Sequence, residues 1–131
     1  MCKILLSINP EHVENIIKGI KKYEYRTKVA KRDVDKIIVY CTYPTKKVLA
    51  EVEIKGILKD TPENLWEKTK NYSGITKEFF MAYFKDREVA YAYQLGKVLK
   101  YNKPKELIEF GCMAAPQSYV YVYAWNKGKR K

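Results

Sequence analysis

Two strand-like segments follow each other within residues 37–54, and the chain between them is too short to hold a helix. Residues 37–42 are a continuous apolar run, Pro44 marks a turn, and apolar side chains alternate with two glutamates over residues 48–54. Strands joined so closely pair antiparallel, because a parallel pair needs a crossover of roughly a dozen residues. A doubly wound parallel α/β sheet is therefore excluded.

Helix-start signals divide the rest of the chain. Asn9-Pro10, Thr61-Pro62 and Thr76-Lys77 each place a capping residue before a first helical residue. The first helix is expected to run over residues 10–18 and to end at Gly19 with positive φ. Its apolar stripe leaves His12 on a solvated face, so we expect no chemical role for this histidine.

Further strand patterns cover residues 3–8, 22–26, 88–100 and 117–125, with Gly96 marking a bulge or bend. Helices that are segregated from about six strands favour an α+β fold with a curved, largely antiparallel sheet. We expect one domain over residues 1–126, followed by a basic tail at 127–131.

The charge balance points to a polyanionic partner. Lys and Arg number 26 against 15 Asp and Glu, which gives a formal net charge of +11 and a pI near 9.5. Nucleic acid is the commonest partner of so basic a domain, and residues 28–36 and the tail would contact its phosphates. The alternative is a lysine-rich proteome in which a basic surface has no nucleic-acid partner.

Cysteine and histidine are too sparse for a metal centre. Cys2, Cys41 and Cys112 are isolated, and His12 is the one histidine, so we expect free thiols, no metal and no cofactor. A Ser-His-Asp or Cys-His enzyme is excluded unless His12 serves. The N-terminus reads as a first strand and no apolar run approaches a membrane span, which predicts a cytoplasmic protein without a membrane partner.

Residues 19–26 carry the most informative pattern. In an extended chain Tyr23 and Tyr25 point to one face, whereas Glu24 and Arg26 point to the other. A carboxylate between cationic groups stays ionised and accepts hydrogen bonds from an exocyclic amine, and arginine pairs with phosphate or stacks. The alternative is a solvated, charged strand face.

The spacing Gly-x-Lys-x-x-Glu-x-Arg over residues 19–26 resembles the signature of the ASCH family in the PUA-like superfamily. The resemblance extends over residues 3–125 and includes Leu-Ser-Ile-Asn-Pro at residues 6–10 and the segments 40–44 and 115–119. It is typical of small stand-alone archaeal, bacterial or phage members. It implies a curved antiparallel or mixed β-barrel of about six strands with flanking helices, and a cleft beside the motif.

The same resemblance implies that this basic cleft binds RNA, another nucleic acid, a modified nucleobase or a nucleotide-like small ligand. Lys21, Glu24 and Arg26 would line it, with Gln117 and Ser118 opposite and Thr42 as a weaker candidate. The Gln117 amide offers a donor and an acceptor to a base edge, although it could equally hold a loop backbone in place.

Some members of the resembled family are enzymes, so a small hydrolase in the same cleft is the alternative function. One bacterial branch hydrolyses acetylated cytidine and resembles this chain at Lys21, but it carries a threonine nucleophile where this chain has Glu24. A carboxylate cannot replace that hydroxyl in the same acyl transfer. In a ribonuclease-type reaction, Lys21 and Glu24 could form an acid/base pair.

Tyrosines recur at every second residue in two strand patterns. Beside basic residues such a stripe can stack nucleic-acid bases, but a half-buried sheet has tyrosines at the same spacing, and we favour packing. The stripes are Tyr91 and Tyr93 in one strand and Tyr119, Tyr121, Tyr123 and Trp125 in the last one.

Overall fold

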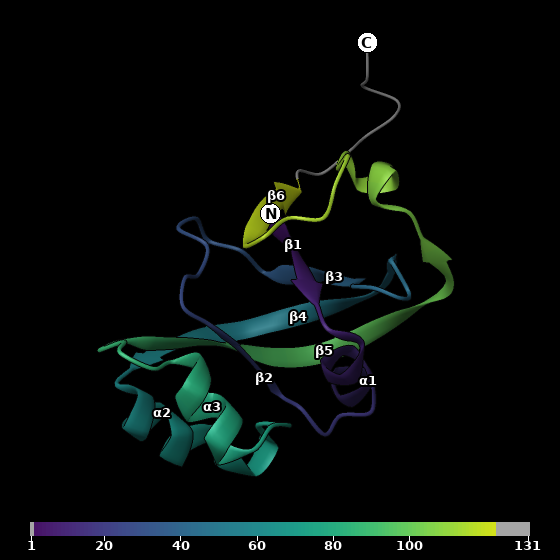
Figure 1. Ribbon diagram of the computed structural model, residues 1–131. Coiled ribbons are helices and arrows are strands. Elements are labelled where there is room, and N and C mark those ends of the chain that lie inside the picture. Colours follow the sequence, from purple (N-terminus) through teal and green to yellow (C-terminus); the bar gives the residue numbers. More distant parts are fainter. Residues whose placement is uncertain (1, 123–131) are drawn as a thin grey trace.

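The computed structural model describes residues 2–122 of the 131-residue chain. Within these residues, six strands form one curled, mixed sheet in the order β2–β5–β4–β3–β1–β6 (Figure 1). Every neighbouring pair is antiparallel except β1 and β3, which run parallel. The strands are β1 (Lys3–Ile8), β2 (Tyr23–Arg26), β3 (Lys36–Cys41), β4 (Lys47–Asp60), β5 (Ala90–Lys105) and β6 (Tyr119–Val122).

In the described part of the chain three α-helices flank this sheet, which confirms the predicted α+β class (Figure 1). They are α1 (Pro10–Ile17), α2 (Pro62–Thr69) and α3 (Lys77–Tyr83), with short 3-10 helices η1 (Lys70–Tyr72) and η2 (Leu107–Phe110). No helix within the described part of the chain is long and apolar enough to cross a membrane. Tyr123, Trp125 and the predicted tail at 127–131 lie outside the described residues.

The helix ends follow the predicted signals closely. Thr61 and Thr76 each accept a hydrogen bond from a backbone N–H of the first turn that they precede, and Gly19 has φ +82°. Asn9 stands at the N-cap position of α1, but its side chain makes no capping hydrogen bond. Its Oδ1 accepts from the Thr42 hydroxyl at 3.3 Å instead.

A bulge interrupts the long β4–β5 ribbon where the sequence predicted it. Val52 pairs with Val98 and Ile54 with Leu95, so β5 carries one extra residue at Gly96 and Lys97. A Cβ at Gly96 would lie 2.9 Å from Oε1 of Glu53, so a larger residue here would have to displace the Glu53 side chain. Beyond the bulge β5 continues to Lys105, past the predicted end at residue 100.

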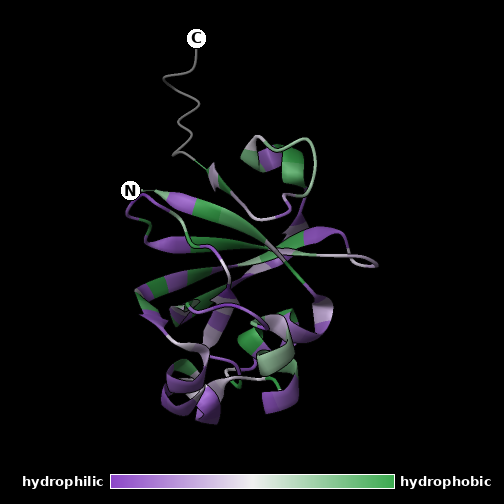
Figure 2. Ribbon diagram, turned by 60° about the vertical axis from the view of Figure 1, so that its left-hand side comes forward, coloured by the Kyte–Doolittle hydropathy of each residue, from purple (hydrophilic) through white to green (hydrophobic). Residues whose placement is uncertain are grey.

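Apolar residues are buried on both faces of the sheet. Figure 2 shows hydrophobic segments along the central strands. One cluster packs α1 against the sheet through Val13 and Ile16, and a smaller one around Leu5 lies on the opposite face. A third cluster, which we call the aromatic cluster, joins β2 to α2 and α3; its buried members are Tyr25, Leu65, Trp66, Phe80, Phe84, Ala90 and Ala92.

The tyrosine stripes hold the basic loop between β2 and β3. The buried Tyr93 hydroxyl accepts a hydrogen bond from the Ala30 N–H at 2.8 Å. The Tyr121 hydroxyl accepts from the N–H groups of Lys31 and Arg32, both at 3.0 Å. These contacts support the packing interpretation of the described tyrosines.

Candidate functional site

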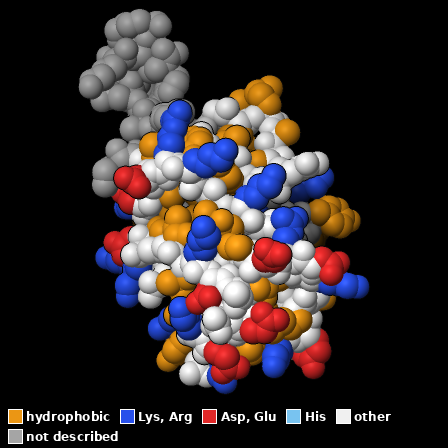
Figure 3. Space-filling view, turned by 90° about the vertical axis from the view of Figure 1, so that its left-hand side faces the viewer, with side chains coloured by type: hydrophobic (Ala, Val, Ile, Leu, Met, Phe, Trp, Pro, Cys, Tyr) orange, Lys and Arg blue, Asp and Glu red, His pale blue; other side chains and the backbone are white. Residues whose placement is uncertain are grey.

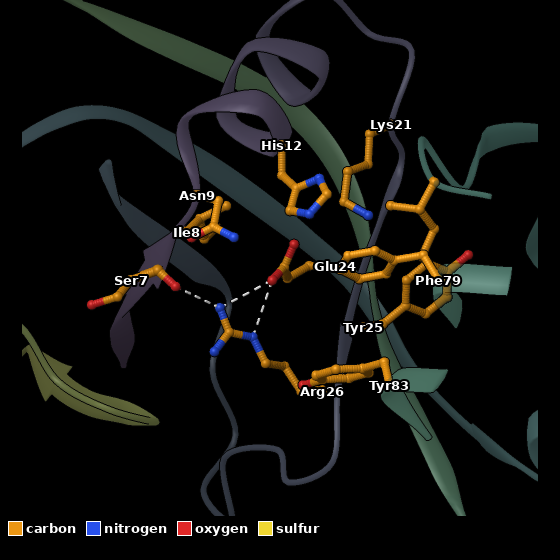
Figure 4. Close-up of a pocket in the computed structure, with 11 residues that line it drawn as sticks. Ser7, Ile8, Asn9, His12, Lys21, Glu24, Tyr25, Arg26, Phe79 and Tyr83 are labelled. Atoms are coloured by element: carbon orange, nitrogen blue, oxygen red, sulfur yellow. Dashed lines mark hydrogen bonds and ion pairs between the residues drawn. The ribbon is translucent and has the colours of Figure 1, made fainter. Parts of the chain in front are cut away.

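A cavity of about 190 Å³ lies where β2, the β1–α1 junction and α3 meet (Figure 4). It is smaller than the roughly 300–1,000 Å³ of drug-sized ligand sites, so it fits one ring system rather than an extended molecule. Its walls combine charged and aromatic side chains. They are Ser7, Ile8, Asn9, His12, Lys21, Glu24, Tyr25, Arg26, Ile75, Phe79 and Tyr83.

Lys21 is almost fully buried, with 3% of its surface exposed. Its Nζ donates to the carbonyl of Ser73 at 2.8 Å and lies 4.8 Å from the ring centroid of Tyr25. Burial lowers the pKa of this amine; Glu24 opposes the shift and Arg26 adds to it. The cavity therefore holds a lysine that gives up its proton more readily than a solvated one.

The turn after η1 keeps Lys21 in place. Gly74 has φ +70°, and a Cβ there would lie 2.7 Å from the Cβ of Lys21. The adjacent Ser73 is buried and supplies the carbonyl that accepts from Lys21. A serine followed by a glycine is a common helix-breaking pair, and that pattern alone gave no sign that these residues position Lys21.

Glu24 and Arg26 form an ion pair at the cavity wall. Oε2 of Glu24 accepts from Arg26 Nε at 3.0 Å and lies 3.0 Å from Nη2, which also donates to the Ser7 carbonyl at 2.8 Å. The other oxygen of Glu24 points toward His12 and Lys21 (Figure 4). Only 6% of the Glu24 surface is exposed, so the solvated-face alternative is wrong for this residue.

His12 is half-buried and lines the cavity, so its predicted place on a solvated face is wrong. Its Nδ1 is buried and has no hydrogen-bond partner among residues 2–122, and its ring meets Phe79 edge-to-face with centroids 5.8 Å apart. Burial, and next the charge of Lys21, lower its pKa, so the imidazole is neutral at pH 7. The periodicity of α1 showed which face meets the sheet, but not that α3 covers a second face.

Helix α3 contributes two exposed aromatic side chains to the cavity rim. Phe79 and Tyr83 are 50% and 40% exposed, whereas Phe80 and Phe84 are buried in the aromatic cluster. By their spacing alone, all four could belong to one apolar face of the helix. Only the second pair packs inward, because residues 79 and 83 lie one position earlier around the helix and face the cavity.

The structure brings three of the six predicted ligand-binding residues together, namely Lys21, Glu24 and Arg26. Thr42 does not line the cavity, although its hydroxyl donates to Asn9, which does. Gln117 and Ser118 are exposed in the segment before β6. A hydrogen bond of 2.9 Å from the Ser7 hydroxyl to the Pro116 carbonyl connects that segment to the cavity wall. Ligand contacts by these residues stay predictions.

The arrangement offers hydrogen-bonding groups beneath an aromatic rim. Lys21 is a donor, Glu24 an acceptor, and a neutral His12 presents one donor and one acceptor nitrogen. Within residues 2–122, no three His, Cys, Asp or Glu side chains come together as a metal site. The groups present suit a flat, polar heteroaromatic ligand.

Comparison with known proteins gives a family-level match. The model described as the ASCH domain matches residues 6–110. The crystal structure of ASCH from Zymomonas mobilis has a TM-score of 0.84 at 22% identity, covering 92% of this chain and 87% of that one. A mutant form of the same protein also has a TM-score of 0.84, at 21% identity and with 92% and 90% coverage.

Two curated relatives come from Ureaplasma parvum. A protein named ATP synthase subunit alpha is 29% identical over 120 residues, and one named large ribosomal subunit protein uL22 is 28% identical over 121 residues. Each alignment covers 91% of this chain. The chain spans only 15% and 39% of the respective relatives' lengths.

Proposed function

The chain belongs to the ASCH domain family, as residues 19–26 suggested, and we propose that its cavity takes a nucleobase of RNA or of another nucleotide-containing ligand. The family is one of PUA-like domains that generally bind nucleic acid, and the fold matches it. Both curated relatives carry the aligned stretch as a minor part of a longer chain. Its presence in two differently named proteins supports a binding module that can be joined to different sequences in one chain.

One observation carries the proposal: buried hydrogen-bonding groups lie directly beneath exposed aromatic rings. Phe79 and Tyr83 can stack on a base, a contact worth about 1–3 kcal/mol per base. Glu24 can accept from an exocyclic amine while Lys21 donates to a ring nitrogen or carbonyl. The cavity volume of about 190 Å³ suits a single base.

The basic surface supplies contacts that do not depend on base identity. Lys and Arg side chains gather in the upper part of the face in Figure 3, and acidic side chains lie mostly in its lower part. Lys28, Lys31 and Arg32 of the loop between β2 and β3 are exposed. Phosphate contacts of this kind release counterions, so the affinity for RNA should fall steeply with salt.

The test is competition binding of ribonucleosides and short single-stranded RNAs to the wild type and to Glu24→Gln. The variant should fold, keep or slightly raise its non-specific RNA affinity, and lose discrimination between bases. Glu88→Gln is the matched control, because it removes one carboxylate at an exposed position away from the cavity. Failure of the wild type to bind any nucleoside or RNA at low salt would contradict the proposal. It would also be contradicted if Glu24→Gln kept the base preference of the wild type.

A small hydrolase in the same cavity is the second candidate. The observation that favours it is the buried amine of Lys21, whose lowered pKa suits a general base, with the Glu24 carboxylate and the neutral His12 beside it. Wild-type protein incubated with RNA and with acetylated cytidine would then give product, and Lys21→Met would abolish it. Intact substrates after incubation with the wild type would reject this candidate.

A further inference from the structure

A second hollow adjoins the cavity, and we infer that it binds the phosphate of the nucleotide whose base the cavity holds. This inference rests on the proposed function. The hollow has a volume of about 390 Å³ and lies between the end of α1, the start of β2 and the β4–β5 bulge. We call it the lysine hollow; Lys22, Lys55 and Lys97 surround it, with Gly19 and Gly96 in its wall.

Lys21 lines both the cavity and the lysine hollow. Its Nζ is fixed by the Ser73 carbonyl and the Tyr25 ring on the cavity side. Among the described residues Lys21 is the one that lines both spaces, so the cavity and the lysine hollow are neighbours. A ligand that carries a ring and an anionic group a few bonds apart fits both, and a nucleotide has this form.

The charge of the lysine hollow favours an anion. Lys22, Lys55 and Lys97 are exposed and belong to none of the ion pairs found within residues 2–122, whereas Lys36 and Lys47 pair with glutamates. Lys22 Nζ lies 4.6 Å from the centroid of the Tyr72 ring. Ammonium groups without a carboxylate partner are available to phosphate oxygens.

Among residues 2–122, Glu53 is the one acidic residue that lines the lysine hollow. Its Oε1 accepts a hydrogen bond from the Lys97 backbone N–H at 3.2 Å, so the bulge holds the carboxylate beside Gly96. This residue opposes anion binding. Even without Lys21, whose ammonium is held on the cavity side, three lysines against one glutamate leave the hollow positive. Removing the Glu53 charge should therefore strengthen phosphate binding.

Gly19 leaves room for a close approach to the backbone, whereas Gly96 lets the Glu53 and Lys55 side chains pack against the bulge. Gly19 has φ +82°, and a Cβ placed on it would meet no atom within 4 Å, so the space above it is open. Gly96 lies at the bulge, where a Cβ would press on Glu53 and Lys55. Glycine at these two positions adds no side chain of its own to the hollow.

The experiment compares each ribonucleoside with its monophosphate, using Lys55→Gln/Lys97→Gln. Nucleoside affinity should stay within about twofold of the wild type, and monophosphate affinity should fall about tenfold. For single-stranded RNA, the slope of log affinity against log salt should become shallower by about 1.4, or about 0.7 for each of the two ammonium groups removed. Glu53→Gln should change monophosphate affinity in the opposite direction.

Lys100→Gln/Lys103→Gln is the matched control. Both lysines are exposed on β5, and neither lines the cavity or the lysine hollow. This variant should bind monophosphates as the wild type does. An equal loss of monophosphate affinity in the two double variants would overturn the inference, because the effect would then reflect net charge alone.

Binding measurements on the wild type distinguish failure of this inference from failure of the proposed function. Wild-type protein that binds nucleosides and monophosphates equally well would overturn the lysine hollow as a phosphate site and leave the base cavity intact. Inorganic phosphate should bind at least tenfold more weakly than a monophosphate, and equal affinity would reduce the hollow to a general anion site and contradict the inference. Wild-type protein that binds no nucleoside, monophosphate or RNA would overturn both.

Discussion

Helix α3 separates two regions that bury opposite kinds of side chain. On one side, Phe80 and Phe84 pack into the aromatic cluster against Trp66, with Phe80 and Trp66 ring centroids 5.1 Å apart. On the other side, Phe79 and Tyr83 stay exposed while the charged Lys21 and Glu24 are buried below them. The first region follows the usual distribution of residues between core and surface, and the cavity inverts it.

The aromatic cluster and the cavity differ in how much they stabilise the fold. Buried charged groups are tolerated when they are paired, as Glu24 is with Arg26, but such pairs stabilise a fold less than apolar packing does. Exposed aromatic rings add little to folding. The aromatic cluster therefore stabilises the fold, and the cavity is organised to bind a ligand.

The sharpest test of the contrast is a pair of truncations on α3. Phe80→Ala should lower the free energy of unfolding by about 3–5 kcal/mol, because it empties a fully buried site. Phe79→Ala should change it by less than about 1 kcal/mol and instead weaken nucleobase binding by about 1–3 kcal/mol. Denaturant unfolding and nucleoside titration of both variants measure the two effects. Similar stability losses in the two variants would erase the distinction.

Truncating the ion pair should have the next largest effect. Glu24→Ala should cost about 3 kcal/mol of unfolding free energy, because it leaves the Arg26 guanidinium without its carboxylate in a poorly solvated place. Glu24→Gln keeps an acceptor oxygen and should cost about 1 kcal/mol. Chemical denaturation of both variants checks this order. Unfolding of the glutamine variant would make Glu24 a structural partner of Arg26 rather than a recognition residue.

Two glycines with positive φ allow a matched test of how Lys21 is held. Gly74→Ala should cost about 2–4 kcal/mol and displace Lys21, because the new Cβ meets the lysine stem. Gly19→Ala should cost about 1–2 kcal/mol, from backbone strain alone, because its Cβ would meet nothing. Thermal melts give the costs, and nucleoside binding should fall only in the first variant. Equal binding in both would show that the turn does not position Lys21.

The charged groups of the cavity should produce measurable changes in the pKa of His12, the one histidine in the chain. Its pKa should lie below the usual 6.5, rise in Lys21→Met and fall further in Glu24→Gln, because Lys21 lowers it and Glu24 raises it. The unfolded chain then binds this proton more readily, so this residue's contribution to stability is lost as pH falls below about 6.5. Ring-proton NMR titrations give each pKa. Identical pKa values in the wild type and the two variants would show that Lys21 and Glu24 do not influence His12.

Features fixed by local backbone chemistry were predictable from the sequence. The threonine caps, the positive φ of Gly19 and the bulge at Gly96 each follow from the residue itself and its immediate neighbours. The antiparallel pairing of β3 and β4 followed from the short connection between them. The spacing of residues 21, 24 and 26 likewise brought the three charged side chains to one place.

Features that depend on packing between distant elements were not predictable. Phe79 and Tyr83 form one i,i+4 pair and Phe80 and Phe84 another, and a helix of seven residues buries only one of them. The second aromatic pair was the available sequence signal that another side of α3 faces a binding site. His12 gave no such signal, because its place in the cavity depends on where α3 lies.

Binding of a nucleobase in the cavity beneath Phe79 and Tyr83 can be observed directly. Each ribonucleoside is titrated into the wild-type protein, and binding is followed through the ring protons of His12. We expect a saturable shift of the His12 resonances for at least one base, with an affinity that matches competition by RNA containing that base. Saturable RNA binding that leaves the His12 resonances unmoved would contradict the proposed function and place the binding surface elsewhere on the molecule.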